Sequence, residues 1–417
     1  MKKKVLVIGS GGREHAIVFQ LSRSQQVEQI FCAPGNAGIA ELAECVPVKD
    51  TDVPSLLAFA KEQQIDLCVV GPEAALNAGV ADAFRETGIP VFGHSKAATQ
   101  IEASKEFAKV LMAKYNVPTA SYRSFSEYEQ AIAYVRAQNA YPTVLKYDGL
   151  AAGKGVVIAA TEEEAESALR DMLVGEAFGK GRVVIEEYLE GPEFSFMAFV
   201  DHHRVYPMPL SQDHKRAYDG DKGPNTGGMG AYTPLPFISP EEEQWAKTHI
   251  LQRVADAMVT EGKPLTGVLY GGLMKTKDGI KVIEFNARFG DPETEVVLPL
   301  MESDAYTVFH AIATGEELDM IHWRKEATVG VVMASCGYPG SYEKGALITG
   351  VEDFDGLVLH MGTKKQEDKL VTNGGRVLMC IAHGADIPTA QQKVYSEIRK
   401  IHCTNLFYRK DIAHWAL

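Results

Sequence analysis

Three polar side chains at alternate positions of one apolar segment offer a site for a hard metal ion and phosphate oxygens. The segment reads VIEFNARFGDPETE, and Glu284, Asn286 and Arg288 occupy every second position. In a β-strand such residues point to the same face. A carboxylate and a carboxamide oxygen suit Mg²⁺, and a guanidinium suits a phosphoryl group, as Mg²⁺–ATP chemistry requires. A solvated strand face shows the same alternation, but the polar run continues into Asp291 and Glu293, which favours function.

A glycine-rich segment near the start of the chain resembles a phosphate-binding turn. In VLVIGSGGREHA an apolar strand leads into a helical pattern, so the amides of Gly11 and Gly12 could bind an anion and Arg13 could add a bidentate contact. A dinucleotide fingerprint needs glycine where Glu14 stands and an acid at the end of the second strand, which reads FCA. The segment is therefore a phosphate site or a plain tight turn, and a nicotinamide cofactor is disfavoured.

A second glycine-rich segment, DGLAAGKG at residues 148–155, lies between two strand patterns. It lacks the residues that a P-loop requires at its first and last positions, but it could form a flap over a triphosphate and carry Lys154. Lys146 lies inside the preceding strand pattern, TVLKY. A lysine there needs an anionic partner or an outward edge position, and taken alone the edge position is favoured.

The segment EEYLEGPEFS is a weaker indication of nucleotide binding. Glu186 and Leu189 lie at the end of a strand pattern, where backbone groups could contact an adenine edge. Glu193 follows a Gly-Pro turn and could hold ribose hydroxyls. Acidic residues at the end of a strand are usually only exposed to solvent, so this segment alone does not indicate nucleotide binding.

The composition is that of an ordinary globular protein. Its 417 residues suggest two to four domains. A net charge of −13 provides no overall attraction to nucleic acid or to anionic membranes. Six cysteines lie without a CxxC pair, which suits reduced thiols, and the apolar run after MKKK is too short for a signal peptide or membrane span. We therefore expect a soluble cytoplasmic protein with neither nucleic-acid nor membrane partners.

The elements that position these motifs fall into three regions. Residues 1–103 alternate short apolar strands with helical patterns, which predicts a parallel sheet with helices on both faces. Residues 104–325 contain an amphipathic helix, several strands and an antiparallel hairpin that turns at residues 277–279. Within that region, residues 211–236 lack a hydrophobic period and predict a long functional loop. Residues 326–417 predict a small α+β domain.

Taken in order, five segments closely resemble the glycinamide ribonucleotide synthetase family, ATP-grasp ligases of de novo purine synthesis. The segments are VIGSGGREHA, VGPEAAL, YPTVLKYDGLAAGKGV, DHKRAYDGDKGPNTGGMGAYTP and EFNARFGDPETE. They span nearly the whole chain, and RFGDPETE and GPNTGGMGAY are the most specific. The resemblance implies a multidomain α/β and α+β protein: a Rossmann-like pre-ATP-grasp domain, an ATP-grasp domain with a lid subdomain at about 122–193, and a C-terminal mixed domain.

The resemblance also implies the reaction. ATP would convert the carboxylate of glycine to glycyl phosphate, and the amine of 5-phosphoribosylamine would attack it, giving glycinamide ribonucleotide, ADP and phosphate. The implied cofactors are ATP and Mg²⁺ or Mn²⁺. We expect a stand-alone monomer with at most weak contacts to other purine-pathway enzymes. Another ATP-grasp carboxylate–amine ligase of purine synthesis, or a nucleotide-binding protein without catalysis, stays an alternative.

The family's residue roles carry over to matching positions of this sequence. The implied ATP-binding residues are Lys105, Lys146, Gly153, Lys154, Gly155, Glu186, Glu187, Leu189 and Glu193. The implied substrate-binding residues are Gly11, Gly12, Arg13, Glu14, Glu73, Asn225, Thr226, Gly228, Asp291 and Glu293. Glu284 and Asn286 would bind the metal. Arg288, Asp213 and Lys215 are the implied catalytic residues, with Arg288 at the transferring phosphoryl group.

The sequence departs from the family pattern in two places. The strand GVLYGGLMKT offers no further acidic metal ligand, so a second metal ion would share Glu284 or depend on ATP oxygens and water. His94 stands where proline is expected, either as a loop variation or as an active-site residue.

Overall fold

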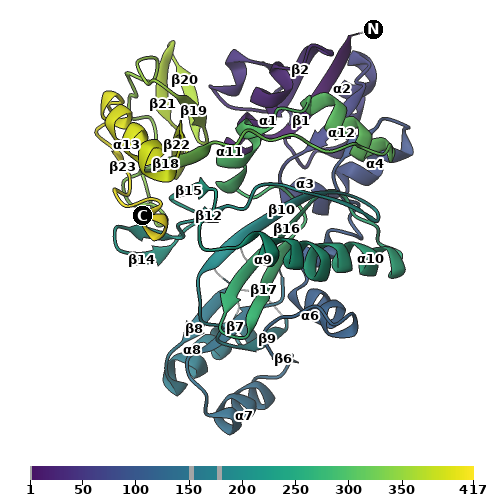
Figure 1. Cartoon of the computed structure of the whole chain (residues 1–417), viewed down its shortest axis with the longest axis vertical. Helices are drawn as coiled ribbons and strands as arrows, with labels where there is room; N and C mark the ends of the chain where they lie inside the picture. The colour runs from purple at the N-terminus through teal and green to yellow at the C-terminus, as the bar shows by residue number, and fades with distance from the viewer. Residues whose placement is uncertain (1, 150–154, 176–180) are drawn as a thin grey trace.

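The computed structural model describes residues 2–149, 155–175 and 181–417, and four sheets of four or more strands organise these residues. In Figure 1 the N-terminal region lies at the top, the C-terminal sheet at the left and a small subdomain at the bottom. Gly153 and Lys154, predicted to belong to the lid, lie outside the described residues. Within the described ranges, no helix is long and apolar enough to cross a membrane.

The N-terminal region is a parallel sheet with the order β3-β2-β1-β4-β5. Its strands are β1 (Lys3–Gly9), β2 (Val27–Pro34), β3 (Glu44–Cys45), β4 (Leu67–Val70) and β5 (Val91–Phe92), and its helices are α1 (Gly12–Ser22), α2 (Val53–Gln63), α3 (Glu73–Ala78) and α4 (Val80–Glu86). Val5 and Val7 of β1 pack into one core, whereas Leu6 and Ile8 pack into another, because the sheet is covered on both faces. The helical segment between β4 and β5 is divided into α3 and α4 at Gly79, whose φ of +86° ends α3.

The central region contains an antiparallel sheet with the order β11-β10-β16-β17. Its strands are β10 (Glu193–Asp201), β11 (Arg204–Pro207), β16 (Thr266–Thr276) and β17 (Gly279–Asn286). The predicted hairpin is confirmed: Thr276 pairs with Gly279, whose φ of +107° glycine adopts readily. The register places Glu284 opposite Gly272 and Asn286 opposite Tyr270.

Helices pack against this central sheet. They are α5 (Gln100–Ala103), α6 (Lys105–Lys114), α9 (Pro240–Ala246) and α10 (Arg253–Thr260), with a π-helical turn (Lys247–Gln252) between α9 and α10. Ile250 and Val254 share a buried cluster with Leu269 and Leu273 of β16. α5 and α6 contact β17, which brings the predicted ATP-binding residue Lys105 beside the row of polar side chains.

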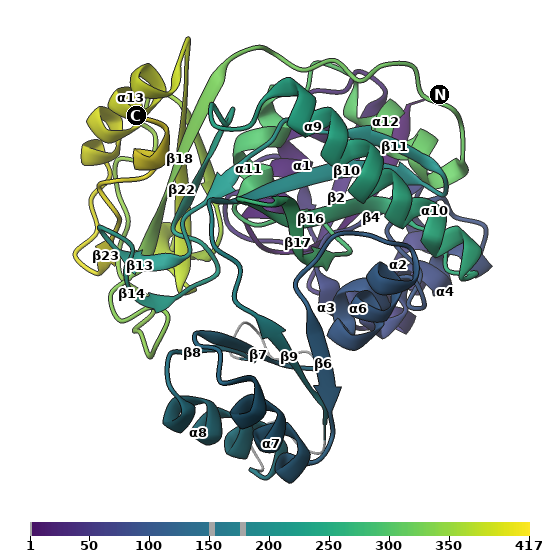
Figure 2. The same cartoon turned by 60° about the horizontal axis from the view of Figure 1, so that its bottom comes forward.

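A smaller antiparallel sheet stands apart from the rest of the molecule (Figure 2). Its order is β6-β9-β7-β8, with β6 (Tyr122–Phe125), β7 (Thr143–Tyr147), β8 (Val156–Ala159) and β9 (Val183–Glu187), and with α7 (Tyr128–Gln138) and α8 (Glu162–Leu173) packed on it. Ile132, Leu145 and Leu169 belong to a hydrophobic core of its own. A unit with a separate core can move as one body relative to the central sheet.

The C-terminal sheet extends beyond the sequence boundary expected at residue 326. Its order is β12-β15-β18-β22-β19, with β12 (Gln212–Asp213), β15 (Gly230–Thr233), β18 (Ala327–Ser335), β22 (Arg376–Gly384) and β19 (Leu357–His360). The segment expected to be a loop at 211–236 therefore contributes two strands, and β13 (Arg216–Tyr218) and β14 (Lys222–Asn225) form a hairpin between them. Helix α13 (Ile387–Glu397) packs on β18 and β22.

One short helix lies where the regions meet. α11 (Glu293–Val297) follows the RFGDP segment and contacts α1 of the N-terminal region. It also contacts β15, β18 and β22 of the C-terminal sheet. The motif that contains the polar row thus runs from the central sheet into the junction of all three regions.

Candidate active site

A first cavity, of about 240 Å³, lies between the small subdomain and the central sheet. β17 contributes Glu284 and Asn286, and Arg288 lies just beyond its end. Lys105 comes from the first turn of α6, and Lys146 comes from β7. The predicted face of a carboxylate, a carboxamide and a guanidinium is thus joined by two lysines from other elements, as expected for a triphosphate site.

Glu284 is the ionised centre of this cavity. Burial alone would favour its neutral form, but Lys215, Lys146, Lys105 and Arg288 together hold the pKa of Glu284 below its ordinary value. An ionised carboxylate and the amide oxygen of Asn286 are suitable ligands for Mg²⁺. Among the described residues no group of three or more His, Cys, Asp and Glu side chains forms a metal site. These donors therefore fit an ion that takes its remaining ligands from nucleotide oxygens and water.

Lys146 is a buried lysine with an anionic partner. Its Nζ lies 3.0 Å from Glu186 Oε1 and donates to the carbonyl oxygen of Ile283 at 3.0 Å. Lys109, which no sequence motif indicated, lies 2.8 Å from Glu186 Oε2, and burial lowers the pKa of Lys109 to about 8. β7 lies between β9 and β8, so an edge position for Lys146 is excluded. The sequence did contain an indication of Lys109: it follows Lys105 by four residues, so both lysines lie on the same face of one helix.

Arg288 is held by two acids. Its Nη2 lies 3.2 Å from Glu102 Oε1, and its Nε lies 3.6 Å from Glu73 Oε2. The other oxygen of Glu102 accepts the amide of Ala287 at 2.8 Å. Although burial opposes it, the positive charges of Arg288 and Arg13 keep the pKa of Glu73 below its usual value. Glu73 and Glu102 both line the cavity, and only Glu73 was predicted from the sequence.

The other residues predicted to bind ATP are distributed unevenly around this cavity. Gly155 and Glu186 line it. Glu187 accepts the amide of Ser121 at 3.1 Å, and Glu193 forms an ion pair with Lys215. Glu187, Leu189 and Glu193 are absent from the described lining, so their roles in ATP binding stay predictions.

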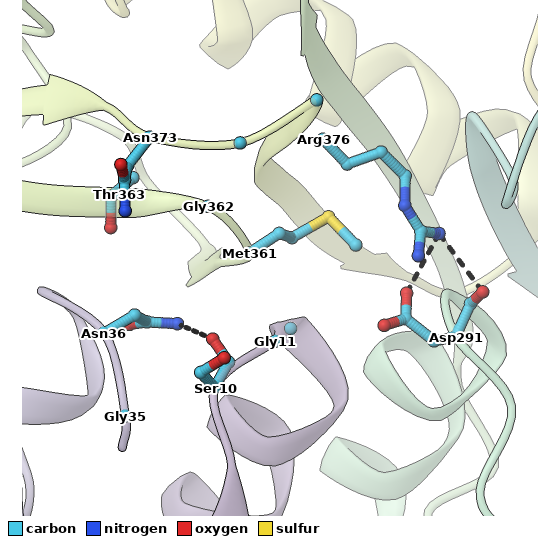
Figure 3. Close-up of a pocket in the computed structure, with 13 residues that line it drawn as sticks. Ser10, Gly11, Gly35, Asn36, Asp291, Met361, Gly362, Thr363, Asn373 and Arg376 are labelled. Atoms are coloured by element: carbon cyan, nitrogen blue, oxygen red, sulfur yellow. Dashed lines mark hydrogen bonds and ion pairs between the residues drawn. The ribbon is translucent and has the colours of Figure 1, made fainter. Parts of the chain in front are cut away.

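A second cavity, of about 310 Å³, lies between the N-terminal glycine loop and the C-terminal sheet (Figure 3). Its lining consists of Ser10, Gly11, Gly12, Gly35, Asn36, Asp291, Met361, Gly362, Thr363, Asn373, Gly374, Gly375 and Arg376. Gly11 and Gly12 lie at the N-terminus of α1, where backbone amides without an intrahelical partner favour an anion, although the amide of Gly11 donates to Glu14. The polar side chains from the C-terminal region were missed, because the sequence alone does not bring them beside the first glycine loop.

Asn36 joins the two sides of this cavity. Its Nδ2 donates to the carbonyl oxygens of Ser10 and His360, both at 2.8 Å, and its Oδ1 accepts the amides of Gly38 and Ile39. Figure 3 shows the side chain spanning toward Ser10. A single carboxamide thus fixes the glycine loop relative to the C-terminal strands. In the sequence Asn36 stands in the turn PGNAG, but nothing in the sequence indicates which residues this turn contacts.

Arg13 and Glu14 are absent from the lining of the second cavity. Glu14 Oε2 accepts the amide of Gly11 at 2.6 Å, and Oε1 accepts Arg13 Nε at 2.7 Å. Arg13 also donates to the carbonyl oxygen of Phe289 at 3.1 Å. Glu14 therefore caps the N-terminus of α1 through the amide of Gly11, and the acid in the third glycine position shapes the loop. Both side chains are buried and have protein partners, and substrate contacts by them stay predictions.

A polar cluster surrounds Glu293, and its members, which include the predicted residues Asp213 and Lys215, are absent from the lining of both cavities. Glu293 Oε1 accepts the hydroxyls of Ser195 and Tyr270, each at 2.8 Å. Asp213 on β12 has its pKa raised to about 8, because desolvation and the charges of Glu293 and Glu193 outweigh the attraction of Lys215. Asp213 is thus a carboxyl group that can hold or release a proton near neutral pH.

The remaining predicted residues of the long loop form a tight turn. Thr226 Oγ1 donates to the carbonyl oxygen of Lys215 at 2.9 Å and accepts the amide of Gly228 at 3.0 Å. Asn225 is exposed at the end of β14. These contacts fix the segment around Lys215, and substrate contacts by Asn225, Thr226 and Gly228 stay predictions.

His94 is a structural connector. Its Nδ1 accepts the amide of Thr266 at 2.9 Å, so its Nε2 donates to the carbonyl oxygen of Val268 at 2.7 Å. The ring is fully buried, and burial lowers the pKa of His94 to about 4. His94 lines neither cavity and joins the N-terminal region to β16.

Comparisons with known proteins agree with this architecture. Family models described as phosphoribosylglycinamide synthetase match in three parts: the N domain at residues 3–102, the ATP-grasp (A) domain at 103–294 and the C domain at 328–415. The phosphoribosylamine–glycine ligase of Halalkalibacterium halodurans is 53% identical over 417 residues, covering 99% of this chain and 97% of that protein.

Solved structures extend the comparison. The crystal structure of phosphoribosylamine–glycine ligase from Thermotoga maritima has a TM-score of 0.88 and 34% identity, covering 98% of this chain and 100% of that one. The biotin carboxylase domain of Hydrogenobacter thermophilus 2-oxoglutarate carboxylase, in complex with MgADP, shares the fold with a TM-score of 0.74 at 17% identity, over 98% of this chain and 92% of that one. This chain belongs to the phosphoribosylglycinamide synthetase family of ATP-grasp ligases.

Proposed function

We propose that this protein joins glycine to 5-phosphoribosylamine with cleavage of ATP to ADP and phosphate, through glycyl phosphate, in purine biosynthesis. One observation carries the proposal: the segment from Glu284 to Asp291 runs from the nucleotide-type cavity to the anion-type cavity. Asn286 and Arg288 face the first, and Asp291 faces the second. A single rigid segment can thus place an activated carboxyl group beside the amine of a sugar phosphate.

The first cavity has the charges needed to activate a carboxylate. A carboxylate is a poor acyl donor, because its oxygen leaves readily only after phosphorylation. Lys105, Lys146 and Arg288 supply positive charge around the phosphates, which stabilises the transferring phosphoryl group. Mg²⁺ or Mn²⁺ held by Glu284 and Asn286 would withdraw further charge from the phosphate oxygens. The small subdomain with its separate core is suited to close over the acyl phosphate and exclude water.

The second cavity has the features of a sugar-phosphate site. Backbone amides at the N-terminus of α1 suit the phosphate, and Thr363 and Asn373 add polar side chains opposite them. Asp291 supplies an acceptor for hydroxyl or amino groups. Asp213 lies outside the lining of this cavity, and its pKa of about 8 suits it to exchange the proton that the attacking amine loses.

Glycine-dependent release of ADP tests the proposal. We expect turnover only when ATP, Mg²⁺, glycine and freshly formed phosphoribosylamine are all present. Alanine in place of glycine and an amine without the phosphate should each fail. Glu284→Gln and Arg288→Gln should lower kcat by about a hundredfold or more, as does loss of transition-state charge stabilisation in other enzymes, whereas Glu243→Gln, outside both cavities, should not. Folded protein without turnover under these conditions would contradict the proposal.

Two finer properties belong to the same proposal. We expect Mn²⁺ to replace Mg²⁺, because Mn²⁺ also accepts carboxylate and amide oxygens. We expect the chain to act as a monomer, which sedimentation at assay concentration can measure.

A further inference from the structure

A buried acid behind the glycine loop has no part in the reaction described above. Glu295 on α11 is fully buried, and neither carboxyl oxygen receives a hydrogen bond from a donor group of the described residues. Burial removes the water that stabilises a carboxylate charge. Burial and the neighbouring Asp291 therefore raise the pKa of Glu295 well above its ordinary value. The neutral acid is the form that this environment favours.

The position of Glu295 connects it to the second cavity. A side-chain carbon added at Gly12 would lie 2.6 Å from Glu295 Oε1, so the carboxyl group lies directly against the backbone of the first residue of α1. Gly12 and Asp291 both line the cavity. Asp291, four residues before Glu295 in the chain, lies beside it: a side-chain carbon added at the adjacent Gly11 would lie 3.6 Å from Asp291 Oδ2.

The charges around this pair balance only when one proton is present. Arg376 Nη1, from β22, lies 3.0 Å from Asp291 Oδ1, and Figure 3 shows the guanidinium directed at Asp291. Arg376 also donates to the carbonyl oxygens of Gly227 and Asp291, so it does not turn freely toward Glu295. With a proton on Glu295, the three groups form one ion pair and one neutral acid. Without it, the fully buried carboxylate of Glu295 and the partly buried carboxylate of Asp291 would face the guanidinium of Arg376.

We propose that Glu295 is a positioning residue: its carboxyl proton is donated in a hydrogen bond to Asp291 and fixes that carboxylate toward the cavity, where Asp291 binds the hydroxyl and amino groups of the sugar-phosphate substrate. The inference rests on the proposed function. The ion pair with Arg376 constrains Asp291 from one side, and the hydrogen bond from Glu295 constrains it from another. A carboxylate held by two partners binds its ligand with less loss of rotational freedom.

Glu295→Gln and Glu295→Met separate the hydrogen bond from the packing. Glutamine keeps a donor of the same size, whereas methionine keeps the volume and removes the donor. Steady-state rates are measured while phosphoribosylamine, glycine and ATP are varied in turn. For Glu295→Met we expect the KM for phosphoribosylamine to rise about tenfold to a hundredfold, as for loss of a hydrogen bond to a charged group, and for Glu295→Gln less than about threefold. The KM for ATP should not change.

Glu243 on α9 provides a matched control. Burial also raises the pKa of Glu243, but this residue lines neither cavity. Glu243→Gln and Glu243→Met should leave all three KM values unchanged. Thermal unfolding of every variant separates loss of fold from loss of binding.

Infrared spectra of the unliganded protein give an independent readout. The difference between wild type and Glu295→Gln should contain the carbonyl band of a protonated carboxylic acid. Absence of that band, an unchanged KM in Glu295→Met, or equal impairment of both variants would overturn the inference. If Glu295→Met does not fold, the presence or absence of the carbonyl band in the infrared difference spectrum tests the inference. Absence of turnover by the wild type would instead count against the ligase function.

Discussion

The carboxylate of Glu102 joins α5 to the guanidinium of Arg288, with Oε1 3.2 Å from Nη2, while its second oxygen accepts the amide of Ala287. One acid thus fixes both the side chain and the backbone of the segment that carries the implied phosphoryl-stabilising group. The orientation of Arg288 therefore depends on an element that lies far from it in sequence.

Replacing Glu102 should impair the chemical step. In Glu102→Gln the amide group can still accept one hydrogen bond but no longer attracts the guanidinium. We expect kcat to fall about tenfold to a hundredfold, the usual effect of losing a hydrogen bond to a charged group. Thermal unfolding and steady-state rates measure this. A kcat equal to that of the wild type would show that Arg288 is oriented without Glu102.

Lys109 should contribute to nucleotide binding through Glu186. Lys109→Met leaves the buried carboxylate of Glu186 with Lys146 as its ion-pair partner and removes one positive charge from the wall of the first cavity. We expect the KM for ATP to rise about tenfold, as for loss of a hydrogen bond to a charged group. Lys114→Met is the matched control, since Lys114 lies on the same helix but is exposed and pairs with Glu261. Equal KM values for the two variants would exclude this role.

Asn36 should couple the glycine loop to the C-terminal sheet. Asn36→Ala removes the hydrogen bonds to Ser10 and His360, so the second cavity loses the side chain that joins its two walls. We expect the KM for phosphoribosylamine to rise about tenfold, with the KM for ATP unchanged. Asn405→Ala, which removes a single bond to Glu343, is the control. A parallel change in the KM for ATP would argue for a general loss of fold.

His94 should make the stability of the protein depend on pH. Its folded-state pKa of about 4 lies below the unfolded value near 6.5, so the unfolded state binds the extra proton between these values. The neutral ring therefore contributes full stability above about pH 6.5, and the contribution is lost as the pH falls toward 4.

Urea unfolding at two pH values tests the role of His94. Between pH 7.5 and pH 5.5 we expect His94 to account for a decrease of about 1.4 kcal/mol in the free energy of unfolding. His94→Gln should show a decrease smaller by that amount. Identical decreases in the two proteins would mean that His94 does not titrate in this way.

Sequence patterns predicted the hairpin and the parallel sheet, because both depend on residues that are close together in the chain. The β16–β17 hairpin follows from an Asp-Gly turn between apolar runs, and the N-terminal sheet follows from short apolar strands between helices. The strands β12 and β15 were missed, because β15 pairs with β18 about a hundred residues later and its own sequence carries no alternation. Such strands form because they pair with strands distant in sequence, and a local sequence pattern carries no information about that pairing.

The residues of the candidate site likewise divide into those that a local sequence pattern indicates and those that depend on distant contacts. The row of Glu284, Asn286 and Arg288 could be recognised because the three side chains occupy alternate positions of one short segment, on β17 and just beyond its end. Glu102 and Arg376 could not, because each acts on a partner that is distant in sequence. Glu14 shows what the motif alone could not predict. Its position in the glycine motif indicated an altered binding loop, whereas in the structure its side chain caps α1.

The fate of a labelled oxygen tests the central claim most directly. Glycine carrying a heavy oxygen isotope in its carboxylate is converted in the presence of ATP, Mg²⁺ and phosphoribosylamine, and the released phosphate is analysed by mass spectrometry. Activation as glycyl phosphate predicts that each phosphate formed carries one labelled oxygen, because the carboxylate oxygen leaves as phosphate. Phosphate without the label, formed together with the amide product, would contradict the account.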